Sequence, residues 1–147
     1  MFSTLLFVSP SLYSAASRET HLVRVVTLLF SLQNPRSPKN EQQLVMDEIP
    51  DDSPSALQAV KSLAAYLSNP LEREEQVQKM KNMLEEPAIG QNATVQLMAA
   101  TIFAKEGDMV EAMRCCSTML SLELSAFMVN LLISMDRVDV AEKTLAK

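Results

Sequence analysis

The side chains best suited to catalysis or metal binding are scarce in this chain. Its 147 residues include one histidine, His21, and two cysteines, the neighbours Cys115 and Cys116. A metal site needs several ligands at set spacings, and nucleophilic catalysis needs a nucleophile beside a base. His21 has no second histidine to complete a metal site and no evident nucleophile beside it. The sequence therefore predicts no metal site, no cofactor and no catalytic residue, and we expect the protein not to be an enzyme.

The adjacent cysteines could be a redox pair or soft metal ligands, but core positions explain them better. Two neighbours on a helix cannot reach the geometry of an ordinary disulfide. No further cysteine is present to complete a metal site. One of the two falls on the predicted inward face of its helix. We interpret both as small core residues of a protein in a reduced, cytoplasmic setting.

The charged residues and glycines give no sign of nucleic-acid or nucleotide binding. The chain has 13 Lys and Arg against 18 Asp and Glu, a formal net charge of −5, whereas nucleic-acid binding needs clustered cations. A loop that cradles phosphates needs closely spaced glycines, but Gly90 and Gly107 lie far apart. The acidic runs 47–48, 51–52 and 72–75 could face a basic partner, yet helix caps and solvated helix faces explain most of them.

The elements that would position a functional surface are clearest between residues 92 and 120. Asn92 begins an N-glycosylation sequon but stands where a helix cap is needed, so we interpret it as a cap. Gly107 suits the left-handed conformation that ends a helix, and Asp108 with Glu111 forms a capping box for the next helix. The residues predicted to face inward, at helical spacing, are Val95, Met98, Ala99, Ile102, Phe103, Met109, Ala112, Met113, Cys116 and Leu120.

The same pattern extends over most of the chain. Two glycines, ten methionines and few aromatic residues favour helices over sheets. The spacing of Ala100, Phe103 and Ala112 around the corner is typical of a tetratricopeptide repeat, in which small residues let paired helices approach. We therefore predict an all-α fold, a right-handed tetratricopeptide-like α-solenoid of stacked antiparallel helical hairpins. The hairpins are predicted at about residues 18–49, 53–86, 92–120 and 123–147, all within one partial solenoid over 18–147.

Local signals add detail to the other segments. Ser53 is predicted to cap a helix that has Pro54 at its first position, and Asn69 to cap one that begins at Pro70. The next-to-last helix, over about 124–135, has very little polar face, so we expect neighbours on both its sides. Residues 1–17 lack the charged region and the long apolar core of a signal peptide, and are expected to be a divergent, poorly ordered segment.

One surface of such a solenoid is suited to binding a partner. The concave face is lined by the first helix of each hairpin. A peptide carboxylate would need several converging cationic or amide groups, and only Lys105 and Asn130 are available. An extended segment or hairpin of a partner protein therefore suits the face better than an acidic tail. The residues expected on it are Thr94, Leu97, Thr101, Lys105, Ala126 and Asn130.

Three segments of the sequence, in this order, resemble one known family. They are LVMDEIPDDSPSALQAVKSLAAYLSNP, AIGQNATVQLMAATIFAKEGDMVEAMRCC and LELSAFMVNLLISMDRVDVAEKTL. The sequence resembles the epsilon subunit of coatomer, the protein coat of Golgi vesicles, and the most specific fragments are DEI, SALQAVKSLAAYL, LMAATIF and MDRVDVAEKTL. Residues 18–31 resemble a diverged family helix, and the proline loop after them looks like an insertion.

The resemblance implies a cytoplasmic, non-catalytic subunit that holds the carboxy-terminal part of the alpha coatomer subunit. It also implies a role in transport from Golgi to endoplasmic reticulum and within the Golgi, with only peripheral, indirect contact with the Golgi membrane and COPI-coated vesicles. Family members are much longer, so the resemblance implies that the carboxy-terminal repeats are missing here. The alternatives are another tetratricopeptide interaction adaptor and a truncated product without function.

Overall fold

The computed structural model describes residues 40–118 and 121–146, and the structural statements below concern those residues. The predicted segment 1–17 and residues 18–39 of the predicted hairpin 18–49 lie outside them. Residues from Gln42 onward belong to one compact unit. Every regular element in the described ranges is helical, so the all-α prediction is confirmed.

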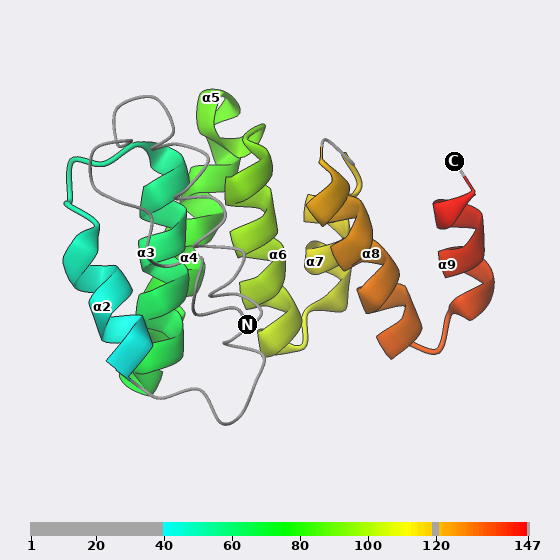
Figure 1. Cartoon of the computed structure of the whole chain (residues 1–147), viewed down its shortest axis with the longest axis horizontal. Coiled ribbons are helices and arrows are strands. Elements are labelled where there is room, and N and C mark those ends of the chain that lie inside the picture. The colour runs from blue at the N-terminus through cyan, green and yellow to red at the C-terminus, as the bar shows by residue number, and fades with distance from the viewer. Residues whose placement is uncertain (1–39, 119–120, 147) are drawn as a thin grey trace, which may run out of the picture. The chain divides into compact units, whose positions relative to one another are not determined.

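The described residues form a run of short helices joined by tight turns (Figure 1). Helices pack as sequential pairs, α3 with α4, α6 with α7, and α8 with α9. Between the pairs, α6 contacts both α3 and α4, and α8 contacts both α6 and α7. This is the stacked-hairpin arrangement of a tetratricopeptide-like α-solenoid. The elements are α2 (Asn40–Glu48), α3 (Ser55–Ser68), the 3₁₀ turn η3 (Pro70–Glu72), α4 (Arg73–Glu85), α5 (Pro87–Gly90), α6 (Ala93–Glu106), α7 (Met109–Cys116), α8 (Leu122–Ser134) and α9 (Val138–Leu145).

Helix α3 begins one residue later than predicted, and its start has no side-chain cap. Pro54 occupies the N-cap position with an extended backbone, at ψ 152°, which leaves Ser53 outside the helix. The Ser53 hydroxyl donates instead to the carbonyl of Pro50 at 2.6 Å. The prediction that Ser53 caps this helix was therefore wrong, because the hydroxyl closes the preceding turn.

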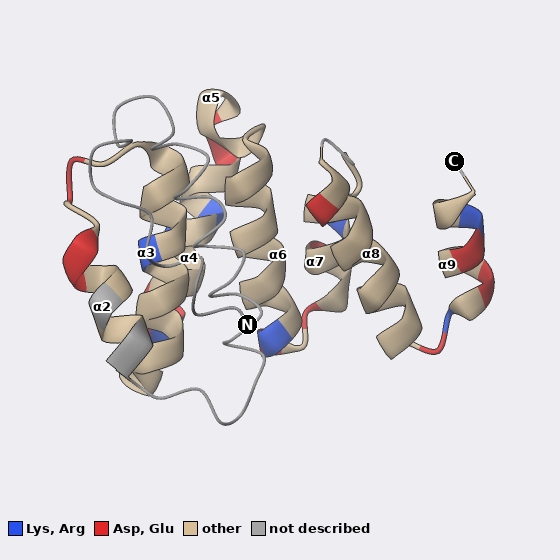
Figure 2. Cartoon of the chain, viewed as in Figure 1, with Lys and Arg blue, Asp and Glu red and all other residues tan. Residues whose placement is uncertain are grey.

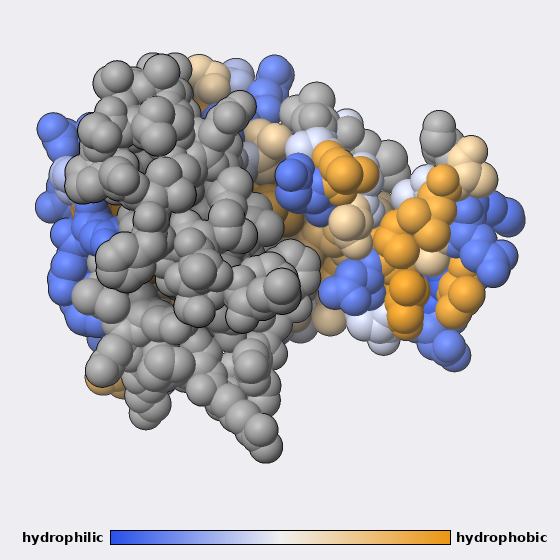
Figure 3. Space-filling view, viewed as in Figure 1, coloured by the Kyte–Doolittle hydropathy of each residue, from blue (hydrophilic) through white to orange (hydrophobic). Residues whose placement is uncertain are grey.

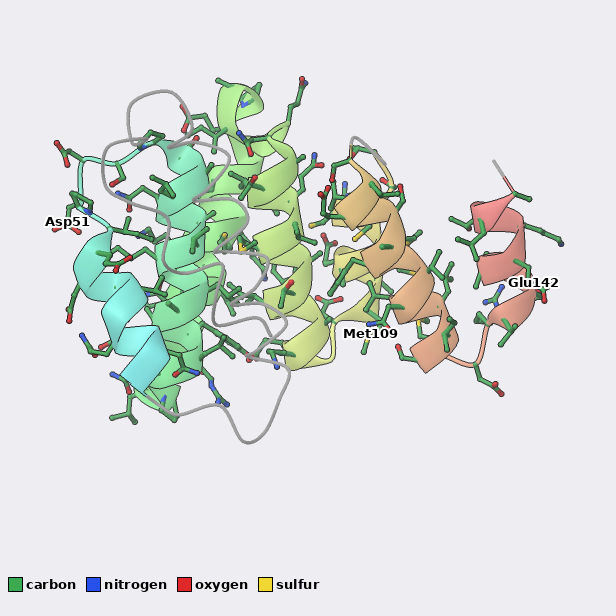
Figure 4. The ribbon with its side chains drawn as sticks, in the orientation of Figure 1. Asp51, Met109 and Glu142 are labelled. Carbon is green, nitrogen blue, oxygen red and sulfur yellow. The ribbon has the colours of Figure 1, made fainter. Side chains whose placement is uncertain are left out.

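Long side chains of α3 hold the loop that precedes it (Figure 4). The Lys61 ammonium donates to the carbonyl of Ile49 at 3.0 Å and pairs with the Asp51 carboxylate at 2.5 Å. The Gln58 amide donates to the carbonyls of Pro50 and Asp51 at 3.2 and 2.7 Å. The hydrogen bond from Lys61 lowers the pKa of Asp51 below its usual value. Residues 49–51 are thus fixed against α3.

Asn69 and Pro70 turn the chain from α3 towards α4, as predicted. The Asn69 side-chain oxygen accepts from the backbone N–H of Leu71 at 3.1 Å, and its amide donates to Glu72 at 2.8 Å. Pro70 is the first residue of η3, where its missing N–H costs nothing. On α4, Met80 is fully buried as predicted.

The corner between α6 and α7 has the backbone conformation that Gly107 predicts. Gly107 is left-handed, with φ of 85°, and the following Asp108 N–H donates to the carbonyl of Phe103 at 2.9 Å. The Asp108 carboxylate accepts from the Glu111 N–H at 3.2 Å. In a complete capping box the Glu111 carboxylate would accept a second hydrogen bond from the Asp108 N–H. That bond is not made, because the Asp108 N–H already donates to Phe103 and the Glu111 carboxylate pairs with Arg114 at 3.3 Å. The corner therefore has a one-way cap.

The core lies along the apolar stripes that the sequence predicts. Asn92 caps α6, since its side-chain oxygen accepts from the N–H groups of Thr94 and Val95. Each fully buried large apolar side chain contributes about 1.5–3 kcal/mol to the free energy of unfolding. On α7, Ala112 and Cys116 are fully buried. The predicted inward positions of α6 are all buried: Val95, Met98, Ala99, Ile102 and Phe103.

Four buried polar side chains of the described residues do not follow from the apolar pattern, and two of them, Ser62 and Gln76, have an atom without a hydrogen-bond partner. Ser62 on α3 is 1% exposed and Gln76 on α4 is 9% exposed. Neither Ser62 Oγ nor Gln76 Oε1 has a hydrogen-bond partner among the described residues. Sequence reasoning missed both, because serine and glutamine usually occupy exposed positions.

Helix α8 is covered mainly on one side, which corrects the prediction of neighbours on both. Leu124, Leu131 and Leu132 are buried, whereas Leu122 is 83% exposed and Ile133 is 54% exposed. Hydrophobic residues all around a helix usually mean complete burial. Here α6, α7 and α9 pack against α8 and still leave the side of Leu122 and Ile133 open.

Candidate partner-binding surface

The first helices of the described hairpins lie next to one another. Helix α6 contacts both α3 and α8, and each of the three pairs with its own second helix (Figure 1). In a solenoid of this type such first helices line one face. The predicted surface residues belong to α6 and α8, so the structure places them on two helices that touch.

Local capping sets how α6 presents its side chains. The cap at Asn92 and the left-handed Gly107 fix its two ends. The side chains of Thr94 and Leu97 are half-buried, and that of Lys105, near the C-terminal end of α6, is exposed. The helix therefore offers a small face that is polar at both ends and apolar at Leu97.

Thr101 differs from the other predicted surface residues of α6. It is 5% exposed, and its hydroxyl donates to the Leu97 carbonyl, one turn earlier, at 2.8 Å. Its hydrogen bond is therefore used within α6. In the described chain Thr101 supports the face from beneath, and Leu97 and Lys105 supply the accessible atoms.

Helix α8 supplies the other part of the predicted surface. Ser121 caps it by accepting from the Leu124 N–H at 3.3 Å. Ala126 and Asn130 are both exposed, one turn apart. Figure 2 shows α8 almost entirely tan, because Glu123 is its one charged residue. The surface of α6 and α8 is thus weakly charged, which suits a protein segment with few charges or with charges of both signs.

The corner residues connect this surface to the core. Met109 begins α7 beside the α6–α7 turn and is half-buried (Figure 4). Glu106, the last residue of α6, accepts a hydrogen bond from the Tyr66 hydroxyl at 2.5 Å. The neighbouring Lys105 is therefore held next to a carboxylate that already has a partner on α3. Sequence reasoning missed this contact, since the two residues are far apart in the chain.

The cysteines have the environment of core residues. Cys115 is 7% exposed and Cys116 is fully buried, so both lie inside, where one was predicted to face inward. Burial is the main reason why the pKa of the Cys115 thiol is raised to about 11 and the pKa of the Cys116 thiol to about 12. Thiols with pKa values this high hold little of the reactive thiolate at neutral pH.

The described residues offer no further site of the kinds considered from sequence. Among them, no group of three or more His, Cys, Asp or Glu side chains could hold a metal ion. His21 lies outside the described residues. In the same part of the chain, no helix is long and apolar enough to cross a bilayer.

Comparison with known proteins decides what this helical array is. The model of the coatomer epsilon subunit family matches residues 36–147. The chain belongs to the coatomer epsilon subunit family. Coatomer subunit epsilon-1 of Arabidopsis thaliana is 41% identical over 103 residues, which are 70% of this chain and 35% of that protein. Coatomer subunit epsilon-1 of Oryza sativa subsp. japonica is 40% identical and epsilon-2 of A. thaliana is 39% identical, over the same shares.

The family match covers every predicted surface residue, since all lie between Thr94 and Asn130. It begins at residue 36, so the proposed likeness of residues 18–31 to a family helix falls outside it. The 103 residues aligned with the epsilon subunits compared span about a third of those proteins, 35% of their length. This chain therefore represents one portion of the family array.

Proposed function

We propose that the chain is a non-catalytic structural subunit of the coatomer coat. The observation that carries the proposal is the family match over residues 36–147, which includes every described helix pair. The relatives are named as coatomer subunits epsilon-1 and epsilon-2. A stacked-hairpin array without a catalytic constellation in its described residues suits an assembly role.

We also propose that the partner is the alpha coatomer subunit, through its carboxy-terminal part. Tetratricopeptide-like arrays hold extended or hairpin segments against their first helices. The weak charge of α6 and α8 and their half-exposed apolar side chains support a segment of that kind. The proposed contact residues are Thr94, Leu97, Lys105, Ala126 and Asn130, with Thr101 supporting them from within α6.

The proposed setting follows from the coat role. The protein would act in the cytoplasm, on the surface of the Golgi membrane and of COPI-coated vesicles. It would reach the membrane indirectly, through the other subunits. The transport served would be from Golgi to endoplasmic reticulum and within the Golgi.

Co-elution tests the partner directly. The 147-residue chain is mixed with a carboxy-terminal fragment of an alpha coatomer subunit and separated by size-exclusion chromatography, with a full-length epsilon subunit as the positive control. We expect the chain and the fragment to elute together. Elution of the two as separate peaks, while the full-length epsilon subunit carries the fragment, would show that this portion of the array does not bind.

A further inference from the structure

Gln96, in the first turn of α6, is a buried polar residue whose amide is bonded at both ends. Its side chain is 5% exposed. The amide nitrogen donates to the carbonyl of Gly90 at 2.8 Å, and the amide oxygen accepts from the hydroxyl of Thr118 at 2.7 Å. A glutamine amide carries both donors and an acceptor, so one side chain can hold two separate segments. Here it joins the end of α5 to a residue just after α7.

The Gly90 carbonyl is itself fixed against the preceding hairpin. A Cβ at position 90 would clash with the carbonyl oxygen of Leu84 in α4, so the close approach of the two backbones requires glycine. The acceptor that Gln96 uses is therefore held next to α4. A chain of contacts from Leu84 through Gly90 and Gln96 to Thr118 connects α4, α6 and the residues that lead into α8.

Thr118 stands close to the start of α8. It lies three residues before Ser121, which caps α8, and the side chain of Leu124 in the first turn is fully buried. Helix α8 packs against α6 and α7, while apolar side chains remain on the surface over α8 and α9 (Figure 3). Among the described residues, the bond to Thr118 is the one hydrogen bond that joins an α6 side chain to the chain beyond the α6–α7 corner.

We propose that Gln96 is a positioning residue, which fixes the start of α8 against the start of α6. Apolar burial has no preferred direction, whereas a hydrogen bond requires a set distance and angle between donor and acceptor. A shift of the chain at Thr118 would leave the buried amide oxygen of Gln96 without a partner, which is costly. The arrangement in which both bonds form is therefore favoured over displaced ones.

This placement bears on the surface of α6 and α8. That surface takes side chains from both helices, so Gln96 sets the spacing between its two parts. The consequence for partner binding rests on the proposed function, whereas the placement of α8 does not. The test below therefore uses the chain without a partner.

The distance between spin labels on α6 and α8 tests the proposal. Labels are attached to Lys105→Cys and Asn130→Cys, two exposed positions, and pulsed electron paramagnetic resonance measures the distribution of distances between them. The wild-type chain, in which Cys115 and Cys116 are buried, is treated with the same label to give the background. We expect Gln96→Leu to widen the distribution by about 2 Å, the size of helix shifts at packed interfaces.

Two variants of Thr118 separate the hydrogen bond from packing. Thr118 is exposed, so neither variant disturbs the core. Thr118→Val keeps the shape without the donor and should widen the distribution as Gln96→Leu does, whereas Thr118→Ser keeps the donor and should match the wild type. Adding Thr118→Val to Gln96→Leu should widen it no further, because the two residues share one bond. Thr118→Val alone decides the outcome if Gln96→Leu does not fold.

A second label pair, Leu71→Cys with Lys105→Cys, is the matched control. Leu71 is 94% exposed at the α3–α4 turn, so this pair does not involve α8 and should be unchanged by Thr118→Val. Circular dichroism checks that each variant is folded. Unchanged α6–α8 distances in Thr118→Val, equal widening by Thr118→Ser, or equal widening of both label pairs would overturn the proposal. Failure of the coat role would appear in the co-elution experiment and would leave these distances as expected.

Discussion

The Tyr66 hydroxyl on α3 donates a hydrogen bond to Glu106 Oε1 at the end of α6, at 2.5 Å and across 40 residues of chain. The guanidinium of Arg73, at the start of α4, lies over the Tyr66 ring, 5.3 Å from its centroid. Tyr66 itself is 2% exposed. Three helices from two successive hairpins therefore meet at one aromatic side chain, which fixes how these hairpins stack beneath Lys105.

Loss of this hydrogen bond should destabilise the array without unfolding it. We expect Tyr66→Phe to lower the free energy of unfolding by about 1–2 kcal/mol, since bonds to charged groups are stronger than neutral ones and Glu106 can regain water. Urea unfolding followed by circular dichroism measures the difference. Glu106→Gln keeps an acceptor and should lose less. Unchanged stability of Glu106→Gln would mean that the carboxylate charge has no part in the contact.

The same tyrosine predicts a loss of stability at high pH. Burial, followed by the hydrogen bond to Glu106, raises the pKa of Tyr66 from 10.0 to about 12. Its contribution to stability is therefore present below pH 10 and is lost as the pH rises through about 12. Between these values the free energy of unfolding should fall more steeply in the wild type than in Tyr66→Phe. The cysteines remain in both proteins, so parallel curves would contradict the raised pKa.

The corner glycine should tolerate no ordinary side chain at low cost. Gly107 has φ of 85°, and a Cβ there would meet nothing within 4 Å. Gly107→Ala should therefore lower the free energy of unfolding by about 1–2 kcal/mol, and this cost comes from the left-handed backbone conformation alone. Asn enters the left-handed region more readily, so Gly107→Asn should cost less than Gly107→Ala. Thermal denaturation ranks the three proteins, and equal stability of all three would contradict the assigned conformation.

A charge in the α6 stripe should be far more damaging than one on the surface. Met98 is fully buried, so Met98→Asp is expected to cost about 4 kcal/mol or more. Val110 is 70% exposed in the first turn of α7, and Val110→Asp should change stability by less than about 0.5 kcal/mol. Chemical denaturation compares the two. A similar, small effect of both would mean that the inward face of α6 is wrongly assigned.

Sequence alone predicted the features that depend on neighbours in the chain. Asn92 and Gly107 are local signals, since each satisfies or shapes a helix end within three residues, and both predictions are confirmed. Ser53 is a local signal that failed, because a competing acceptor, the Pro50 carbonyl, was equally near. Its neighbour Pro54 was expected inside the helix and stands at its boundary.

The features that depend on tertiary packing could not be predicted in the same way. The contact of Tyr66 with Glu106 joins different hairpins, and no spacing rule links residues so distant in sequence. The burial of Thr101 depends on how closely α6 meets its neighbours. The open side of α8 was misassigned from composition, although the spacing of Leu122 and Ile133 already showed that they share a face.

The central claim is that this portion of an epsilon subunit holds the alpha coatomer subunit on the face of α6 and α8. Isothermal titration of a carboxy-terminal alpha fragment into the chain tests it most directly. We predict saturable one-to-one binding that Lys105→Glu weakens by about tenfold, or 1.4 kcal/mol, and that Lys143→Glu on α9 leaves unchanged. Absence of binding, while a full-length epsilon subunit binds under the same conditions, or equal effects of the two variants, would contradict the account.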